Sequence, residues 1–314
     1  MIYTITLNPA LDHYLEVDEF SMDDANRVRA ECLYPGGKGI DVSRAIAHLG
    51  GESMALGFIG GHNGQVLVEL LKREGVSSYF TAIAQETRRD IIVSASRQDT
   101  QTLLHAKGPT VTREEWRCFL SHLELLDLRD AFVTVGGSLP RGVPPDAYGQ
   151  IIARVQRRGA KALLDADGPS LRAGLAAKPF AVKPNVHELQ RAVGRPLRTD
   201  ADLRAAARAL HRRGVQVVIV SMGAKGLLVA NGTRRDATDM WRAVPPAVRV
   251  RSRVGAGDST VAGFVTRYAG GKSLEECLRF ATACGTAATL APGNQLCRLA
   301  DVQRLVPRIR LERL

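Results

Sequence analysis

The stretch VRSRVGAGDSTVAGF at 249–263 is the part of the chain best suited to chemistry, because three small residues precede a single carboxylate. Gly255, Ala256 and Gly257 leave the backbone bare before a helical pattern, so successive N–H groups at a helix N-terminus can converge on an anion. Asp258 would repel a phosphate but is well placed to accept the proton of a hydroxyl that attacks one. In the alternative interpretation, the glycines only permit a tight turn and Asp258 caps the helix.

Two further glycine clusters lie at the ends of apolar runs. The segment YPGGKGIDVSRAIAHLGG at 34–51 ends a strand-like stretch and opens a helix, and Lys38 adds a positive charge. This segment lacks the GxxxxGK(S/T) pattern of a Walker P-loop and the downstream acidic residue of a dinucleotide-binding GxGxxG turn. The segment SMGAKGLLV at 221–229 lies between two apolar runs, where an ordinary hairpin turn is an equal alternative.

The elements that must position these clusters alternate between apolar strands and helical patterns. Short, continuous apolar runs are typical of parallel strands that are covered on both faces. We expect strands at 2–7, 54–60, 131–137, 161–167, 179–185 and 215–223, and helices among 40–49, 64–74, 112–126, 145–158, 199–213 and 258–269. This alternation predicts a three-layer α/β fold with a mostly parallel central sheet.

Two stretches, 13–37 and 87–108, break this alternation. Both show alternating polarity, charges and turn residues in place of buried apolar runs. Strands of this kind leave one face exposed, so we expect them to form a small separate β lid. The chain contains no linker rich in proline, glycine or serine and no internal repeat. The sequence therefore predicts a single domain over 1–314, with lid strands inserted at about 13–37 and 87–108.

Composition narrows the class of protein. The five cysteines are widely spaced and lack ligand spacing, which argues against a disulfide framework or a zinc site and favours a reducing compartment. Neither a leader pattern nor an apolar run of about 18 residues occurs, so we expect a cytoplasmic protein with no membrane partner. The net charge of +11 comes from dispersed arginines, and aromatic residues make up only 5%, so anionic small molecules suit the chain better than nucleic acid.

A set of motifs spans nearly the whole chain in a specific order. The set is TLNPALD, PGGKGIDVSRAIAHLGG, TRRDIIV, GGSLPRGV, VKPNVHEL, SMGAKG, VGAGDSTVAGF and AATLAPGNQLC. Any one of these motifs is a weak signal, but together they closely resemble the PfkB (ribokinase-like) carbohydrate kinases, in the phosphofructokinase and tagatose-6-phosphate kinase branch. The resemblance implies a ribokinase-like fold and an ATP-dependent sugar kinase.

The resemblance implies roles for the residues around the acceptor sugar. Asp258 takes the place of the general base that removes the proton of the sugar hydroxyl, and the N–H groups of Gly255, Ala256 and Gly257 stabilise charge on the transferring phosphoryl group. The implied substrate-binding residues are Asp12, Gly37, Lys38, Asp41, Arg88 and Ser138.

On the nucleotide side, Asn185 and Glu188 are three residues apart, so one helical turn places both oxygens on the same face. The family uses such an N-x-x-E pair to organise Mg²⁺ and its waters. The implied ATP-binding residues are Lys183, Asn185, Ser221, Gly223, Gly226 and Gly257. Relatives hold a monovalent cation, K⁺, at backbone carbonyls that correspond to Ser252, Val254, Ala288 and Gly293. The resemblance therefore implies ATP and Mg²⁺ as cofactors, with potassium activation in addition.

The predicted reaction is phosphoryl transfer from ATP to a ketohexose phosphate, fructose 1-phosphate or fructose 6-phosphate, which gives fructose 1,6-bisphosphate. The alternatives are a tagatose 6-phosphate kinase, a kinase of an unphosphorylated sugar or nucleoside, and a non-catalytic protein that senses a sugar phosphate. The exposed lid strands would present bare edges if they stayed unpaired, so we expect a homodimer formed through the lid. Two lid histidines, His13 and His105, could also contact substrate.

Two positions depart from the family pattern and bear on the choice of substrate. Asp41 and Asp90 stand where the branch usually has Asn. A carboxylate repels a phosphate by about 1 to 4 kcal/mol at 4 Å, depending on the local dielectric. We expect Asp41 to bind hydroxyls away from the phosphate, and Lys38, Arg88 and Arg89 to hold the phosphate itself.

Overall fold

The computed structural model describes residues 1–234 and 237–314 of the chain. Its largest element is a ten-stranded sheet that runs parallel from β5 to β11 and antiparallel from β11 to β14. In sheet order the strands are β14 (Arg310–Arg313), β13 (Ala237–Val244), β12 (Leu227–Arg234), β11 (Val217–Ser221), β10 (Ala181–Val182), β9 (Lys161–Asp165), β8 (Phe132–Gly136), β1 (Ile2–Thr6), β4 (Met54–Ile59) and β5 (Ser77–Ala82). The predicted mostly parallel sheet is confirmed.

The predicted strands differ from the observed ones in length and in completeness. The strand expected at 179–185 is reduced to two residues. The last hydrogen bond of its pairing with β9 runs from the N–H of Lys183 to the carbonyl of Leu164 (3.0 Å). The next residue, Pro184, has no N–H and cannot continue the pairing. Strands β5, β12, β13 and β14 were not predicted. They lie at the two edges of the sheet, where polar residues interrupt the apolar runs.

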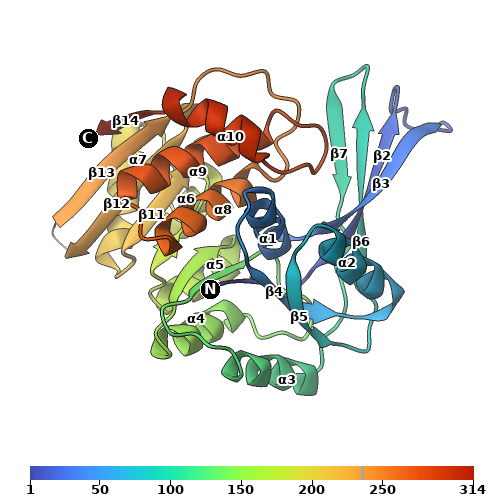
Figure 1. The fold of residues 1–314 in the computed structure, drawn as a ribbon, viewed down its shortest axis with the longest axis horizontal. Helices are drawn as coiled ribbons and strands as arrows, with labels where there is room; N and C mark the ends of the chain where they lie inside the picture. The colour runs from blue at the N-terminus through green and yellow to red at the C-terminus, as the bar shows by residue number, and fades with distance from the viewer. Residues whose placement is uncertain (235–236) are drawn as a thin grey trace.

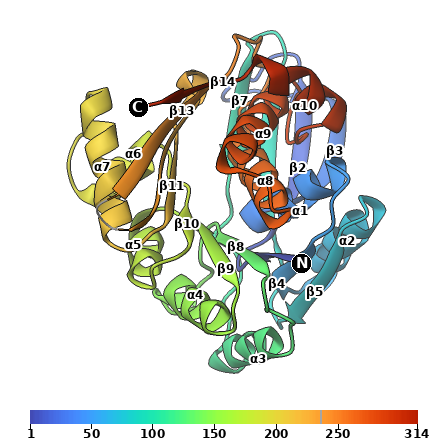
Figure 2. The same cartoon turned by 60° about the vertical axis from the view of Figure 1, so that its left-hand side comes forward.

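Helices cover both faces of the large sheet, so the predicted three layers are present (Figure 2). Alternate residues of one strand enter separate cores: Val218 and Val220 pack with the helices α3 to α7, whereas Val217 and Ile219 pack with α1, α8, α9 and α10. One layer contains α1 (Lys38–His48), α2 (Gly61–Arg73), α8 (Ala256–Ala269), α9 (Leu274–Ala288) and α10 (Leu299–Leu305), and the other contains α3 (Arg113–Glu124), α4 (Ala147–Arg157), α5 (Gly168–Ala176), α6 (Val186–Val193) and α7 (Asp200–Arg212).

A separate four-stranded sheet stands beside the large one and forms the lid (Figure 1). Its strands, in order, are β3 (Val28–Gly36), β2 (Ala10–Val17), β6 (Arg88–Ala95) and β7 (Thr100–Leu104). Thus 13–37 and 87–108 each supply strands to one small sheet, although β2 already begins at Ala10. The parallel pairing of β2 with β6 places Asp12 directly opposite Asp90.

The starts of six helices differ in a way that bears on the site. Helices α3, α6, α7 and α9 each begin with a capping box, in which the side chain at the N-cap and an acidic residue three positions later satisfy each other's backbone N–H groups. Helices α1 and α8 have Gly37 and Gly255 as their N-caps, and neither N-cap makes a side-chain hydrogen bond. The N–H of Ile40 in the first turn of α1 donates to Oγ1 of Thr6 (2.9 Å), and the N-cap of α8 supplies no side chain to the first N–H groups of that helix.

Candidate active site

The start of α8 places a carboxylate beside a bare backbone. Gly255 adopts a left-handed conformation (φ +73°), and a Cβ atom there would overlap the side chain of Leu296, so conformation and packing both require glycine. Asp258 lies in the first turn of α8, and its Oδ1 is buried without a hydrogen-bond partner among the described residues. Burial raises the pKa of Asp258 above its ordinary value, while the nearby ammonium group of Lys38 opposes the rise. A buried, unpartnered carboxylate oxygen is suited to accept a proton.

Two lysines flank a buried aspartate next to this helix start. Nζ of Lys38 lies 3.1 Å from Oδ1 of Asp165, and Nζ of Lys183 lies 3.1 Å from its Oδ2. Burial opposes the charge on Asp165, but Lys183 and Lys38 hold its pKa below the ordinary value. Burial likewise opposes the charge on Lys38, but Asp165 and then Asp258 raise its pKa. Lys38 therefore carries a positive charge beside Asp258, and Lys183 is ion-paired with the same aspartate, Asp165.

The backbone of the glycine cluster lies next to one of these ammonium groups. A Cβ atom on Gly257 would lie 3.3 Å from Nζ of Lys183. Lys183 follows β10, Lys38 begins α1 and Gly257 lies in the first turn of α8, so three segments far apart in the chain meet here. N–H groups and ammonium groups at one point are suited to bind an anion such as a phosphoryl group.

Asp165 was not among the residues singled out from the sequence. Its only signal was its position at the end of the apolar run KALLD, because the carboxyl ends of parallel strands form one edge of a sheet. Lys38 and Asp165 are 127 residues apart, so no local sequence pattern predicts their contact.

On the lid side, Asp12 lies in β2 and accepts a hydrogen bond from Nδ2 of Asn294 (2.9 Å). Burial, and then the neighbouring charge of Asp90, raise the pKa of Asp12 to about 6. A Cβ atom on Gly36 would overlap the carboxylate of Asp12. The two neighbouring glycines, Gly36 and Gly37, are therefore needed for different reasons. Gly36 makes room for Asp12, and Gly37 (φ +116°) starts α1. Gly36 and Asn294 were missed by the sequence analysis.

The unusual carboxylate at position 41 has a buried partner. Nη1 of Arg44 lies 3.1 Å from Oδ1 of Asp41, one helical turn away, and Nε of Arg44 lies 2.9 Å from Glu74. Arg44 is only 2% exposed. Burial raises the pKa of Asp41 well above its ordinary value, Arg44 opposes the rise, and Asp258 and Asp12 add to it. Asp41 therefore lies near both of those carboxylates, and its charge is compensated inside the protein.

Arg88 and Ser138 meet at a residue that the sequence analysis did not name. Nδ2 of Asn8 donates to Oγ of Ser138 (3.1 Å), while the carbonyl of Asn8 accepts hydrogen bonds from Arg88. Arg89 is the next residue on β6, so its side chain leaves the opposite face of the strand, where it donates to Asn63 of α2 (2.9 Å). The structure thus brings Arg88 and Ser138 together and separates Arg89 from them.

The nucleotide-side residues predicted from the sequence lie along the ends of adjacent strands. Asn185 forms an isolated bridge with Ser221, whose N–H donates to the carbonyl of Pro184 (3.0 Å). Gly223 begins a short 3₁₀ turn, η1 (Gly223–Lys225), and Gly226 (φ +82°) leads from it into the antiparallel strand β12. The hairpin-turn interpretation is therefore correct for the geometry of this segment.

The pair proposed for Mg²⁺ forms the capping box of α6. Oδ1 of Asn185 accepts from the N–H of Glu188 (2.9 Å), and Oε2 of Glu188 accepts from the N–H of Asn185 (2.8 Å). In the part of the chain that the structure describes, no group of three or more His, Cys, Asp or Glu residues could hold a metal ion. Oε1 of Glu188 makes no hydrogen bond within that part, so it fits the orientation of a metal-bound water.

The four positions suggested for K⁺ come from three segments. The N–H of Ser252 lies 3.4 Å from the carbonyl of Thr289, directly after Ala288, and Oγ of Ser252 accepts from the N–H of Val254 (3.2 Å). Gly293 (φ +63°) packs instead against the ring of Tyr14 in the lid.

The two lid histidines have different surroundings. Nε2 of His13 lies 2.8 Å from Oε2 of Glu31 on the neighbouring exposed strand β3. Nδ1 of His105 lies 2.7 Å from Oδ2 of Asp90, beside Arg88. Only His105 belongs to the cluster around the predicted substrate residues.

The raised pKa of Asp12 predicts a pH-dependent effect of Asp12→Asn on stability. The folded-state pKa of about 6 exceeds the ordinary 3.8, so between these values the folded protein keeps a proton that the unfolded chain has lost. Wild type should therefore lose up to about 3 kcal/mol of stability, relative to the variant, as the pH rises from about 4 to about 7. Urea denaturation at several pH values measures the difference, and a difference independent of pH would contradict the burial effect.

A three-layer α/β fold with a separate lid sheet, and with a buried carboxylate and two lysines at the carboxyl edge of its large sheet, is the architecture of a small-molecule kinase of the ribokinase-like class. The family model for pfkB family carbohydrate kinases matches residues 5–301. This protein therefore belongs to the PfkB family of carbohydrate kinases.

Individual relatives match over nearly their whole length. The chain is 34% identical to a 1-phosphofructokinase of Borreliella burgdorferi, over 99% of this chain and 98% of the relative. It is 36% identical to the ATP-dependent 6-phosphofructokinase isozyme 2 of Escherichia coli, over 97% of each. The crystal structure of phosphofructokinase-2 from Escherichia coli in complex with substrates and products superimposes with a TM-score of 0.91 at 35% identity, over 98% of each chain.

Proposed function

We propose that this kinase transfers the γ-phosphoryl group of ATP to a ketohexose phosphate, fructose 1-phosphate or fructose 6-phosphate, and so makes fructose 1,6-bisphosphate. The observation that carries the chemistry is the buried, unpartnered Oδ1 of Asp258 at the start of α8, next to Lys38 and Lys183. The names of the similar proteins, 1-phosphofructokinase and 6-phosphofructokinase, support the choice of acceptor.

In the proposed mechanism, Asp258 removes the proton of the attacking hydroxyl. The N–H groups of Gly255, Ala256 and Gly257 bind the transferring phosphoryl group at the N-terminus of α8. Lys38 and Lys183 add two positive charges, and Asp165 fixes the position of both ammonium groups. The protein does little covalent work, because alignment and charge stabilisation supply most of the catalysis.

The acceptor's sugar ring lies, in this proposal, between the lid and α1. Asp12 and Asp41 accept hydrogen bonds from its hydroxyl groups, and Arg88 with Ser138 holds its phosphate. The pairing of Asp41 with Arg44 supports this arrangement, because a compensated carboxylate repels a phosphate less than a free one does. Gly37 positions the start of α1.

ATP is proposed to lie along the strand ends at Lys183, Asn185, Ser221, Gly223 and Gly226. Bound Mg²⁺ would neutralise part of the charge of the ATP phosphates. Asn185 and Glu188 are the residues proposed to orient the waters of this ion. Ser252, Val254, Ala288 and Gly293 remain the proposed K⁺ site, and the potassium complex of phosphofructokinase-2 from Escherichia coli supports a role for this ion.

Glu188→Gln should raise the Mg²⁺ concentration needed for half-maximal activity by about 10-fold, because a neutral amide orients a metal-bound water less well than a carboxylate. The capping box survives, since Gln can also accept the hydrogen bond from the N–H of Asn185. The measurement is an Mg²⁺ titration at fixed ATP, with thermal melting as a control for folding. Superimposable titration curves would remove Glu188 from the proposed Mg²⁺ site.

A substrate panel tests the proposed function. ADP release is measured with ATP, Mg²⁺ and each of fructose 1-phosphate, fructose 6-phosphate, tagatose 6-phosphate, the free sugars and nucleosides, in wild type and in Asp41→Asn. The highest kcat/KM in wild type should fall on one of the two fructose phosphates. If a free sugar has the highest kcat/KM in wild type, and a phosphosugar has the highest kcat/KM only in Asp41→Asn, then Asp41 rejects phosphate. If no compound of the panel causes ADP release but sugar phosphates still bind, the protein is a non-catalytic sensor of a sugar phosphate.

The lid is the proposed contact of a homodimer. The exposed apolar side chains of its outer strands include Val28, Leu33, Leu103 and Leu104, and sheet edges of this kind favour pairing. Sedimentation velocity measures the oligomeric state.

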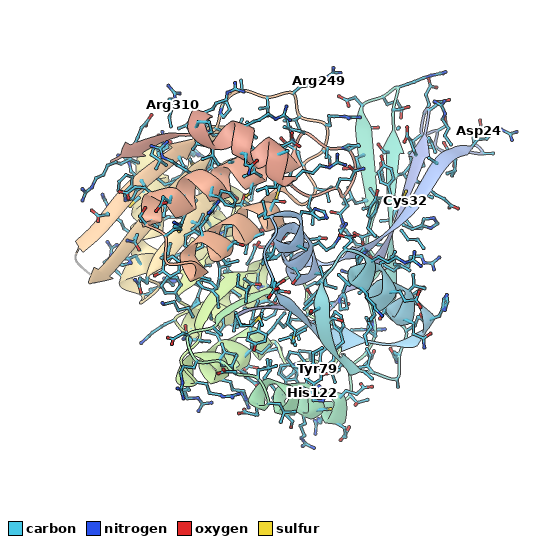
Figure 3. The ribbon with its side chains drawn as sticks, in the orientation of Figure 1. Asp24, Cys32, Tyr79, His122, Arg249 and Arg310 are labelled. Atoms are coloured by element: carbon cyan, nitrogen blue, oxygen red, sulfur yellow. The ribbon has the colours of Figure 1, made fainter. Side chains whose placement is uncertain are left out.

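We further propose a cytoplasmic location. The support is the set of free cysteines, two of which are exposed, including Cys32 on the lid (Figure 3). No helix in the described residues could span a membrane.

A further inference from the structure

The lid joins a carboxylate, an arginine and a histidine at the acceptor side of the site. Asp90 is 2% exposed, and its Oδ1 accepts from the N–H of Ala106 (2.9 Å). Its Oδ2 lies 3.0 Å from Nη1 of Arg88 and 2.7 Å from Nδ1 of His105. Both oxygens of Asp90 therefore have partners, and one of those partners is the residue proposed to bind the substrate's phosphate.

Arg88 has little hydrogen-bonding capacity left for that phosphate. Its Nε and Nη2 both donate to the carbonyl of Asn8 (3.3 and 3.2 Å), and its Nη1 donates to the carbonyl of Ala106 (2.9 Å) and to Asp90. The side chain is 12% exposed. Since a guanidinium group has five N–H donors, most of those of Arg88 are already engaged inside the protein. A phosphate at this point of the lid needs another donor.

His105 is placed to be that donor. Its side chain is 60% exposed, and Nδ1 is the ring nitrogen that faces Asp90. No described residue forms a hydrogen bond with Nε2. A carboxylate on one ring nitrogen fixes the orientation of an imidazole. When the ring carries both protons, Nδ1 donates to Asp90 and Nε2 can donate to a phosphate oxygen.

We propose that His105, oriented by Asp90, is a specificity-determining ligand for the phosphate of the acceptor sugar. The inference rests on the proposed function, because a free sugar has no phosphate to bind. It also accounts for the carboxylate at position 90, where related kinases usually have Asn. Asp90 does not face the phosphate as a free charge, because Arg88 is ion-paired with it and the N–H of Ala106 and Nδ1 of His105 occupy its oxygens.

The test compares His105→Gln with a matched control, His13→Gln. Both histidines lie in the lid and both pair with a carboxylate, but the partner of His13 is Glu31 on the exposed strand β3. His105→Gln should raise KM for the phosphorylated acceptor by about 10-fold, with kcat and the KM for ATP unchanged. Asp90→Asn should raise the same KM, and His105→Lys, which keeps a cationic donor, should retain part of the wild-type affinity. His13→Gln should stay within about 2-fold of wild type.

Equilibrium binding separates this inference from the proposed function. Calorimetric titration with fructose 1-phosphate, fructose 6-phosphate and fructose, without ATP, should show about 10-fold weaker binding of the phosphorylated sugars to His105→Gln and no change for fructose. If wild type phosphorylates only free sugars, the proposed function is wrong, yet these titrations still decide the role of His105. Unchanged sugar-phosphate affinity and KM in His105→Gln, or an equal loss in His13→Gln, would overturn the inference.

Discussion

Replacement of Asp258 by Asn should lower kcat by about 10²- to 10⁴-fold, while the affinities for ATP and for the acceptor sugar stay near those of wild type. The amide keeps the shape of the side chain but cannot take the proton of the attacking hydroxyl. Because burial raises the pKa of Asp258, the acid limb of the wild-type pH–rate profile should lie above that of an ordinary aspartate. Steady-state kinetics and calorimetric binding measure these effects.

The matched control for this variant is Asp167→Asn. Asp167 also begins a helix, α5, but it is half exposed and pairs with Arg191 (2.7 Å) outside the proposed site. The substitution Asp167→Asn removes the same charge from a helix N-terminus, but at an exposed position. The kcat of this variant should therefore stay within about 2-fold of wild type. Near-normal turnover in Asp258→Asn, or an equal loss in Asp167→Asn, would show that Asp258 is not the base.

Arg44→Ala should destabilise the protein by about 3 to 5 kcal/mol, the largest effect on stability that we expect from one substitution. Arg44 is almost fully buried and pairs with both Asp41 and Glu74, and it also donates to the carbonyl of Pro35 (3.1 Å). Its removal would leave the carboxylate of Asp41 buried without a cation and would empty the space of a long side chain. Urea denaturation measures the free energy of unfolding.

Two further variants test whether charge pairing is the cause of this loss. Asp41→Asn combined with Arg44→Met removes both charges and keeps much of the volume, so it should recover a large part of the lost stability. Arg191→Ala breaks an exposed ion pair with Asp167 and should change stability by no more than about 0.5 kcal/mol. A loss below about 1 kcal/mol in Arg44→Ala would mean that the surroundings of Asp41 relax or admit water.

These expectations share one structural cause, which is that the carboxylates of the site differ in their partners. Asp165 has two lysines, Asp41 has an arginine, and Asp90 has an arginine and a histidine. Oδ1 of Asp258 alone among their carboxylate oxygens is buried with neither a hydrogen bond nor an ion pair in the described chain. A buried carboxylate oxygen without a partner is the one best able to accept a proton, because no contact must be broken first.

The sequence by itself determined the fold class, most of the parallel strands and the position of the proposed base. Apolar runs and glycine-rich helix starts are local signals, because the covalent chain places their residues next to one another. The motif Gly255 to Asp258 could therefore be interpreted before any fold was known. The short polar-interrupted edge strands β5, β12, β13 and β14 carry weaker periodicity and were missed.

Only the tertiary structure decided which side chains partner the site residues. Asp12 and Asn294 are 282 residues apart, and Lys38 and Asp165 are 127 apart, so no local pattern connects them. The sequence showed that Asp41 and Asp90 were unusual. Only the packing of α1 against β3, and of β6 against β7, showed that Asp41 pairs with buried Arg44 and that Asp90 contacts both Arg88 and His105. Charge compensation depends on distance through space and on burial, and both are set when segments remote in the chain come together.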